Sequence, residues 1–237
     1  MVDFEKQIND YSFAKAQVRE RSAAVFPLVY GWMCAALAVS GAVAWFVATS
    51  GFAKEVFSGN LFIGCVIAEF ALVIAISAGI RKLPAAAAFA LFALYSAVNG
   101  VTLSFVFLAY ELPSVASVFF VSAAMFGGAA LYGTLSKSDI SGVGSFCGMA
   151  LWGLVIASVV NIFLHSGPLA WVASVFGVAV FTGLAMYDAQ KVKLLAMSAD
   201  TMDRTTARKL ALLGALELYL DFVNLFLYLL RLFGRRR

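Results

Sequence analysis

Hydrophobic residues fill this chain in long stretches, and polar residues are confined to the segments between them. Seven stretches are apolar enough, and at about 20 residues long enough, to cross a membrane as helices. They cover residues 25–49, 61–80, 84–108, 113–134, 143–165, 167–188 and 210–233. The pattern therefore predicts an all-α membrane protein whose residues 25–237 form a single domain of seven transmembrane helices.

Two polar segments lie outside these stretches. Residues 1–24 form a mixed-charge tail without the apolar region or the cleavage site of a signal peptide, so we expect the first stretch itself to direct insertion. Residues 189–209 are polar and long enough to form a surface loop or a frayed helix. Because the other connections are short, we expect the function to lie within the bundle or on this segment.

Composition agrees with the pattern. Apolar residues make up 63% of the chain and charged residues 13%, and the mean hydropathy is +0.94. These values exclude a water-soluble globular protein. The single histidine, His165, leaves no zinc site built on histidines. We expect the lipid bilayer as the surroundings, no bound cofactor and no nucleic-acid partner.

Basic residues are distributed unequally between the two ends of the stretches. Twelve of the 17 lysines and arginines lie at one end, and between the stretches the other end holds only Lys54. Cytoplasmic segments carry such an excess, so we expect a cytoplasmic amino terminus. Arg231 and the arginines at 235–237 lie outside if the last stretch crosses fully, as we expect. A re-entrant last segment would instead leave the tail in the cytoplasm.

Asp221 lies in the middle of the last stretch, where an ionised side chain is costly unless it has a partner. Asp188 ends the sixth stretch on the side where the seventh begins, so the two carboxyl groups can meet where the helices cross. Two carboxylates in contact in a dry site share a proton. The pair is therefore a candidate proton-sensitive dyad, unless Asp188 is only a solvated helix end.

Helix geometry places three further charged residues at the depth of a partner. Arg81 closes the second stretch at the level of the dyad. Glu69 lies 12 residues before Arg81, and Arg231 lies ten residues beyond Asp221. Glu69 and Arg231 therefore lie at a similar depth, nearer the outer side of the membrane. We therefore expect Arg81 to contact the aspartates and Glu69 to pair with Arg231. The alternatives are that Arg81 only anchors the helix in the cytoplasm and that Arg231 snorkels to the interface.

Glu217 and Asn224 lie on the same helix face as Asp221, four residues before it and three after it. They are candidates for lining an oxygen-rich path, although Glu217 is near enough to the start of its helix to be merely exposed. Calcium prefers six to eight oxygen ligands. Asp188 and Asp221, with carbonyl groups and water, therefore suit a weak, transient calcium site.

Five segments carry a family resemblance. The two aspartates lie in AMYDAQKVK and ALELYLDFVNLFLYLLRLFG, and LVYGWM, LYSAVNGVTLS and MFGGAALYG lie in the first, third and fourth stretches. Together they resemble the Bax inhibitor-1 family (transmembrane Bax inhibitor motif, or lifeguard, proteins), in particular its bacterial inner-membrane branch. The resemblance implies a central seventh helix surrounded by the other six, and a pH-sensitive calcium leak with calcium as the transported ion.

The resemblance also implies roles for individual residues. Asp188 and Asp221 match the proton-sharing dyad, Arg81 matches the latch that holds and releases Asp188, and Glu69 and Arg231 match an outer charge pair. Bacterial relatives are similar as well to a modulator of a membrane-bound quality-control protease. A regulator of such a protease, or of a stress or cell-death response, is therefore a second hypothesis.

An intramembrane aspartyl protease is a third hypothesis. Tyr187-Asp188 reproduces the YD pair of those enzymes, but Tyr219-Leu220-Asp221 lacks the glycine that their GxGD motif places before its aspartate. We therefore expect no enzymatic activity.

Overall fold

Helices make up the fold throughout the part of the chain that the structure describes. The computed structural model describes the backbone of residues 2–59, 61–80, 82–198 and 202–237, with side chains from residue 25 onward except that of Lys54. The helices are α1 (Val2–Thr49), α2 (Ala53–Ser58), α3 (Leu61–Gly79), α4 (Ala85–Ala109), α5 (Leu112–Leu135), α6 (Ser141–Leu164), α7 (Gly167–Ser198) and α8 (Arg204–Phe233). No strand occurs within these ranges, and the all-α prediction is confirmed.

Seven helical segments are long and apolar enough to cross a membrane: Val25–Thr49 of α1 and the whole of α3 to α8. Five predicted stretches agree with these bounds to within two residues. The predicted tail is not separate from the first span, because α1 begins at Val2 and continues through it. The short helix α2, which was not predicted, lies between the first two spans.

Of the two forms predicted for residues 189–209, a surface loop or a frayed helix, the structure shows helix for most of the segment, and the loop alternative is wrong there. α7 continues to Ser198 and α8 begins at Arg204, while residues 199–201 lie outside the described part. Ala189, Val192 and Ala196 are all buried, at the three- and four-residue spacing of one helix face. The polar residues of this segment occupy the other faces, which hid the helix from a search for continuous apolar stretches.

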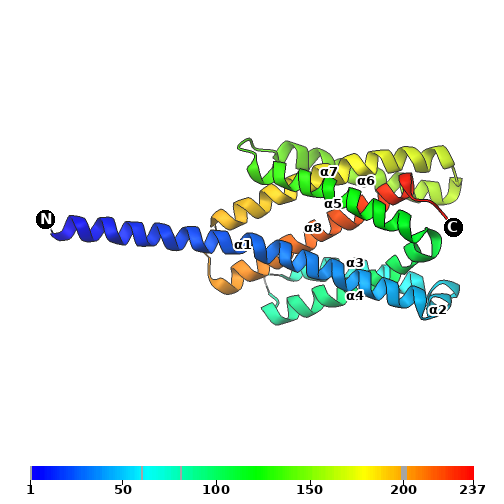
Figure 1. Cartoon of the computed structure of the whole chain (residues 1–237), viewed down its shortest axis with the longest axis horizontal. Coiled ribbons are helices and arrows are strands. Elements are labelled where there is room, and N and C mark those ends of the chain that lie inside the picture. Colours follow the sequence, from blue (N-terminus) through cyan, green and yellow to red (C-terminus); the bar gives the residue numbers. More distant parts are fainter. Residues whose placement is uncertain (1, 60, 81, 199–201) are drawn as a thin grey trace.

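α8 lies at the centre of the bundle (Figure 1). In the apolar 18-residue segment of α8, 67% of the residues are buried inside the protein. The corresponding fractions are 6% in α3 and 11% in α6. The main contacts of α8 are with α1, α4, α5 and α7, whereas α3 packs on α4 and α6 packs on α7. The seventh span is therefore central, with four helices directly around it and two in an outer layer.

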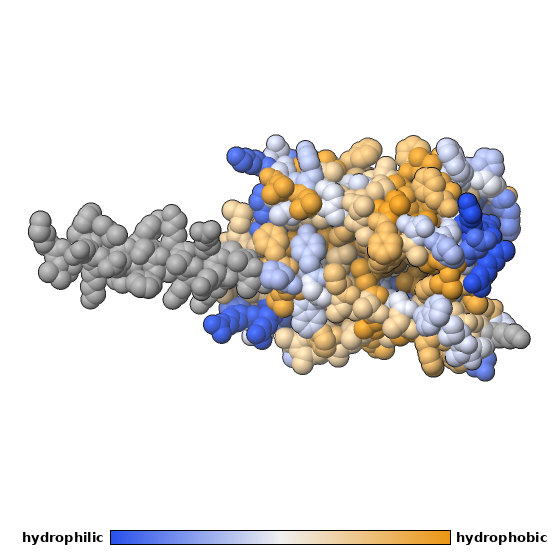
Figure 2. Space-filling model, in the orientation of Figure 1, coloured by the Kyte–Doolittle hydropathy of each residue, from blue (hydrophilic) through white to orange (hydrophobic). Residues whose placement is uncertain are grey.

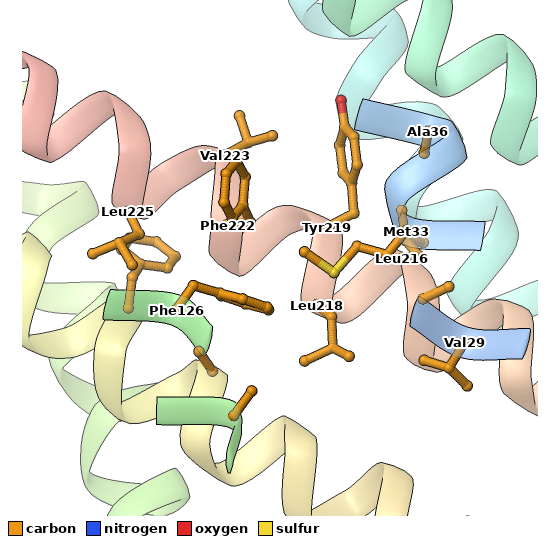
Figure 3. Packing of buried hydrophobic residues seen from close by; sticks show 14 of the residues in the cluster. Val29, Met33, Ala36, Phe126, Leu216, Leu218, Tyr219, Phe222, Val223 and Leu225 are labelled. Atoms are coloured by element: carbon orange, nitrogen blue, oxygen red, sulfur yellow. The ribbon is translucent and has the colours of Figure 1, made fainter. Parts of the chain in front are cut away.

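The core forms where α8 meets α1 and α5 (Figure 3). Large side chains of α8 interdigitate there with α1 and with Phe126 of α5, and Tyr219 is fully buried among them. The outer faces of the bundle expose many large apolar side chains, and hydrophilic residues gather at its two ends (Figure 2). This distribution suits a helix bundle that is surrounded by lipid. The labelled members of the cluster are Val29, Met33, Ala36, Phe126, Leu216, Leu218, Tyr219, Phe222, Val223 and Leu225.

The last segment is one continuous helix and is not re-entrant. Beyond it, the tail pairs with the connection between α4 and α5. The amide of Glu111 donates to the carbonyl of Arg235 at 3.0 Å, and the amide of Arg237 donates to the carbonyl of Ala109 at 3.0 Å. Arg236 and Tyr110 form an isolated antiparallel bridge. The chain therefore ends at the opposite end of the bundle from the start of α8, as full crossing requires (Figure 1).

Candidate functional site

Asp188 and Asp221 meet in the interior of the bundle. α7 and α8 are consecutive helices that pack against each other, and the carboxyl groups of Asp188 and Asp221 interact with each other. Asp188 is 9% exposed and Asp221 is 4% exposed. Asp188 also lies ten residues before the end of α7. It is therefore not a solvated helix end, and the structure brings together the two residues of the predicted dyad.

Small residues hold α7 closely at this level. A side chain at Gly133 of α5 would collide with the backbone carbonyl of Met186, and one at Gly144 of α6 would collide with the ring of Tyr187. Met186 and Tyr187 directly precede Asp188. Two neighbouring helices therefore fix the turn of α7 that carries Asp188, and this turn faces α8.

The carboxyl group of Asp221 has an unsatisfied oxygen. Its Oδ2 atom is buried and has no hydrogen-bond partner among the described residues. An ionised carboxylate only accepts hydrogen bonds, so two ionised aspartates offer each other nothing but repulsion. A buried polar atom without a partner is costly. The geometry therefore favours a proton or a cation held between the two groups.

Lys191 joins this site, although the sequence analysis treated it only as a basic residue of the polar segment. Its Nζ atom lies 3.2 Å from Oδ1 of Asp188 and donates to Oε2 of Glu217 at 2.7 Å. The ammonium group also lies 5.5 Å from the centroid of the Tyr187 ring. The three-residue spacing from Asp188 was visible in the sequence, but it has this meaning only once α7 is known to continue past residue 188.

Exposure decreases along the cluster towards its centre. The side chains of Lys191 and Glu217 are 40% and 33% exposed, and that of Asp188 is 12% exposed. Asp221, one helical turn deeper than Glu217 on α8, is buried. Glu217 is thus partly exposed, as one alternative allowed, and is also part of the cluster. The exposed fraction of the charged side chains therefore falls from Lys191 and Glu217 to Asp188 and Asp221.

A second polar network crosses the core near Tyr219. The hydroxyl of Tyr219 donates to Oδ1 of Asn99 at 2.8 Å and lies 2.7 Å from Oγ of Ser40. The hydroxyl of Thr102 donates to Oε1 of Glu69 at 2.6 Å and to the carbonyl of Asn99 at 2.8 Å. Side chains of α1, α3, α4 and α8 are therefore linked. Tyr219, Thr102 and Ser40 were not predicted as site residues, because aromatic and small hydroxyl residues do not stand out in an apolar span.

The structure does not bring Glu69 and Arg231 together. Glu69 bonds a residue of α4, whereas the guanidinium of Arg231 lies 5.4 Å from the centroid of the Tyr228 ring. The depth of a residue says nothing about its position around the bundle axis, and α3 packs on α4 instead of α8. Asn224 does not extend the path either, since its Nδ2 atom donates to the carbonyl of Leu220 on its own helix.

Two predicted site features remain, the latch residue Arg81 and a cation site. Arg81 lies outside the described residues. In the described ranges, no group of three or more histidine, cysteine, aspartate or glutamate side chains is placed to hold a metal ion. Asp188 and Asp221 thus offer a pair of carboxyl groups, which suits a cation held weakly and briefly better than one held tightly.

Two aspartates outside the spans are fixed in their ionised form. The amide of Ser141 donates to Asp139 at 2.9 Å, and the amide of Thr206 donates to Asp203 at the start of α8 at 2.9 Å. These hydrogen bonds lower the pKa of both carboxyl groups. Both carboxyl groups are therefore charged at neutral pH.

The connection between α5 and α6 is tied to α7 beside the charged cluster. The Gln190 side chain donates from Nε2 to the carbonyl of Ser138 at 2.8 Å and accepts from the amide of Ile140 at 3.1 Å. Lys193 donates to the carbonyl of Ser136 at 2.7 Å. Gln190 and Lys193 thus form hydrogen bonds with backbone groups, whereas Lys191, between them in the sequence, forms ion pairs with carboxylates.

Known proteins resemble this chain over most of its length. The profile of the family described as "Inhibitor of apoptosis-promoting Bax1" matches residues 23–237. Inner membrane protein YbhL of Escherichia coli (strain K12) is 50% identical over 211 residues, which are 88% of this chain and 90% of the relative. An uncharacterized protein of Borreliella burgdorferi is 41% identical over 212 residues, 88% of this chain and 90% of the relative.

A third relative, from Caulobacter vibrioides, is 37% identical over 221 residues, 88% of this chain and 87% of the relative. The region matched by the family profile, residues 23–237, includes both aspartates of the site. Seven apolar helices of spanning length make this an integral membrane protein. On this breadth of similarity, the chain belongs to the Bax inhibitor family.

Proposed function

We propose that this protein is a pH-sensitive calcium leak pathway in which Asp188 and Asp221 share a proton. The observation that carries the proposal is the burial of two interacting carboxyl groups on packed helices, one of which has an oxygen without a partner among the described residues. The name of the Escherichia coli relative supports a bacterial inner membrane as the location. The excess of basic residues supports a cytoplasmic amino terminus.

The mechanism follows from the charge of the dyad. Without a proton, the two carboxylates attract a divalent cation into the bundle, and water and carbonyl groups complete its coordination. With a proton bound, the attraction falls, because one negative charge is lost. In this scheme Arg81 holds Asp188 in one state of the dyad and releases it in the other.

Calcium entry into proteoliposomes at a series of pH values tests the proposal. In the wild type, we expect the flux to change steeply across neutral pH. In Asp188→Asn and Asp221→Asn, the pH dependence should be lost, since an amide neither binds nor releases a proton in this range. The matched control is Asp139→Asn, which removes an exposed carboxylate and should keep the wild-type profile. Equal profiles in all four proteins would remove the dyad from the mechanism.

A regulatory role is the second candidate, and the shape of α1 supports it. This helix begins at Val2 and extends beyond the bundle (Figure 1), which leaves it accessible to a membrane-bound protease or to a stress or cell-death regulator. If regulation depends on contact alone, Asp221→Asn should keep the cellular effect and the partner, and deletion of residues 2–20 should abolish both. The opposite pattern in these two variants would assign the cellular effect to the ion pathway.

A further inference from the structure

Lys191 occupies the place where a cation would first meet the carboxylates. Its ammonium group lies 3.2 Å from Asp188 and 2.7 Å from Glu217. Since α7 and α8 are consecutive spans that cross in opposite directions, Lys191 and Glu217 share a level, one turn nearer the end of α7 than Asp188 and Asp221. A cation entering from that end therefore meets the ammonium group before it reaches the dyad.

We propose that Lys191 is a tethered competitor that any cation must displace from Asp188 and Glu217 before it can reach the dyad. The inference rests on the proposed cation pathway and adds a residue that controls its occupancy and selectivity. The unpartnered, buried Oδ2 atom of Asp221 is a further, independent sign that this site takes a positively charged ligand.

The competition favours divalent over monovalent ions. An ammonium group carries one positive charge, so a monovalent cation that replaces it gains nothing in charge. A divalent cation brings twice the charge to carboxylates that Lys191 neutralises only in part. Lys191 therefore weakens the binding of every cation to these carboxylates, and divalent ions are the ones that attract the carboxylates strongly enough to displace it.

Lys193 provides a matched comparison. It has the same side chain, lies two residues away on α7 and donates to a backbone carbonyl of Ser136 at 2.7 Å. Within the described residues its Nζ atom forms no ion pair, whereas Lys191 forms two. Substitution of Lys193 therefore removes a lysine from α7 without removing an ammonium group that competes with cations for the carboxylates.

Calcium binding to the purified full-length protein at a fixed neutral pH tests the proposal. In Lys191→Met, we expect calcium to bind about ten- to a hundredfold more tightly, because charge-assisted hydrogen bonds no longer have to be broken first. Lys191→Arg keeps the charge and should stay near wild type, as should Lys193→Met. Calcium binding in Lys191→Met no tighter than in Lys193→Met, including no binding in either, overturns the proposal.

A second measurement needs no variant and so does not depend on folding of a mutant. Reductive methylation of the wild type, read by peptide mass spectrometry, reports the accessibility of both lysines in one sample. Calcium should speed labelling of Lys191 by releasing it and leave Lys193 unchanged. Labelling of Lys191 that calcium does not alter contradicts displacement.

The two proposals fail in different ways. If Asp221→Asn keeps the wild-type flux and pH profile, the proposed pathway fails, whatever Lys191 does. If that variant loses the pH dependence while Lys191→Met binds and conducts calcium like the wild type, the pathway stands and the competitor role of Lys191 fails.

Discussion

Tyr219 is the largest of the fully buried side chains, and its hydroxyl joins two other buried polar side chains within a mainly apolar core. It contacts side chains of α1 and α4 through Ser40 and Asn99. Interhelical hydrogen bonds of this kind stabilise membrane proteins modestly, because the polar groups also find partners in the unfolded state. The central helix is therefore held by polar contacts as well as by apolar packing.

Replacement of Tyr219 by phenylalanine should lower the free energy of unfolding by about 1–2 kcal/mol, from the loss of two hydrogen bonds. Unfolding in detergent, followed by circular dichroism, measures the change. Tyr228→Phe is the control, since the contacts described for Tyr228 are through its ring. Equal stability of Tyr219→Phe and Tyr228→Phe would contradict a stabilising role for the Tyr219 network.

Individual site residues were predictable where the free-energy cost of a charge in an apolar span identified them. Asp221 stands out because a carboxylate within an apolar stretch needs a partner, and the start of the next helix pointed to Asp188. The pairing of Glu69 with Arg231 could not be found in this way, since residue counting gives depth and not direction around the bundle. Lys191 was hidden because its contacts require a helix in a segment whose average composition is polar.

At the scale of helices, α5 and α7 approach each other closely at Gly133, next to the site. The carbonyl of Met186 fills the space in which Gly133 would carry a side chain. Gly128, on the same helix, has open space at the equivalent position. Gly133 is therefore required for close packing of the helices, whereas the structure leaves room for a side chain at Gly128.

Gly133→Ala should destabilise the protein by about 1–3 kcal/mol, because the added methyl group pushes α7 away from α5. Gly128→Ala should leave stability unchanged or slightly raised, since alanine favours helix more than glycine does. Thermal unfolding of both variants measures the difference. If Gly133→Ala is as stable as Gly128→Ala, the helices are not held together by this contact.

At the scale of the whole molecule, hydropathy predicted seven spans and their order, because each span needs a continuous apolar surface of fixed length. The extension of α7 and α8 beyond their spans could not be predicted in the same way. Those turns are covered by protein on one face only, so their polar and apolar residues alternate. The central position of α8 came from family resemblance, and hydropathy alone cannot distinguish it.

Orientation across the membrane is a testable consequence of the basic-residue count. In a cysteine-free background, we expect Lys137→Cys to react with an impermeant maleimide only from the cytoplasmic side and Glu111→Cys only from the opposite side. Both side chains are exposed and lie at the two ends of α5. The reversed pattern would place the amino terminus outside.

The central position of α8 also has a consequence for biosynthesis. During translation, α8 leaves the ribosome after all four helices that surround it. Until then, the earlier helices lack their common packing partner, and Asp188 lacks the second half of its pair. A nascent chain that stops before residue 204 therefore lacks the helix on which α1, α4, α5 and α7 pack in common, and the two aspartates meet only once the last span has been made.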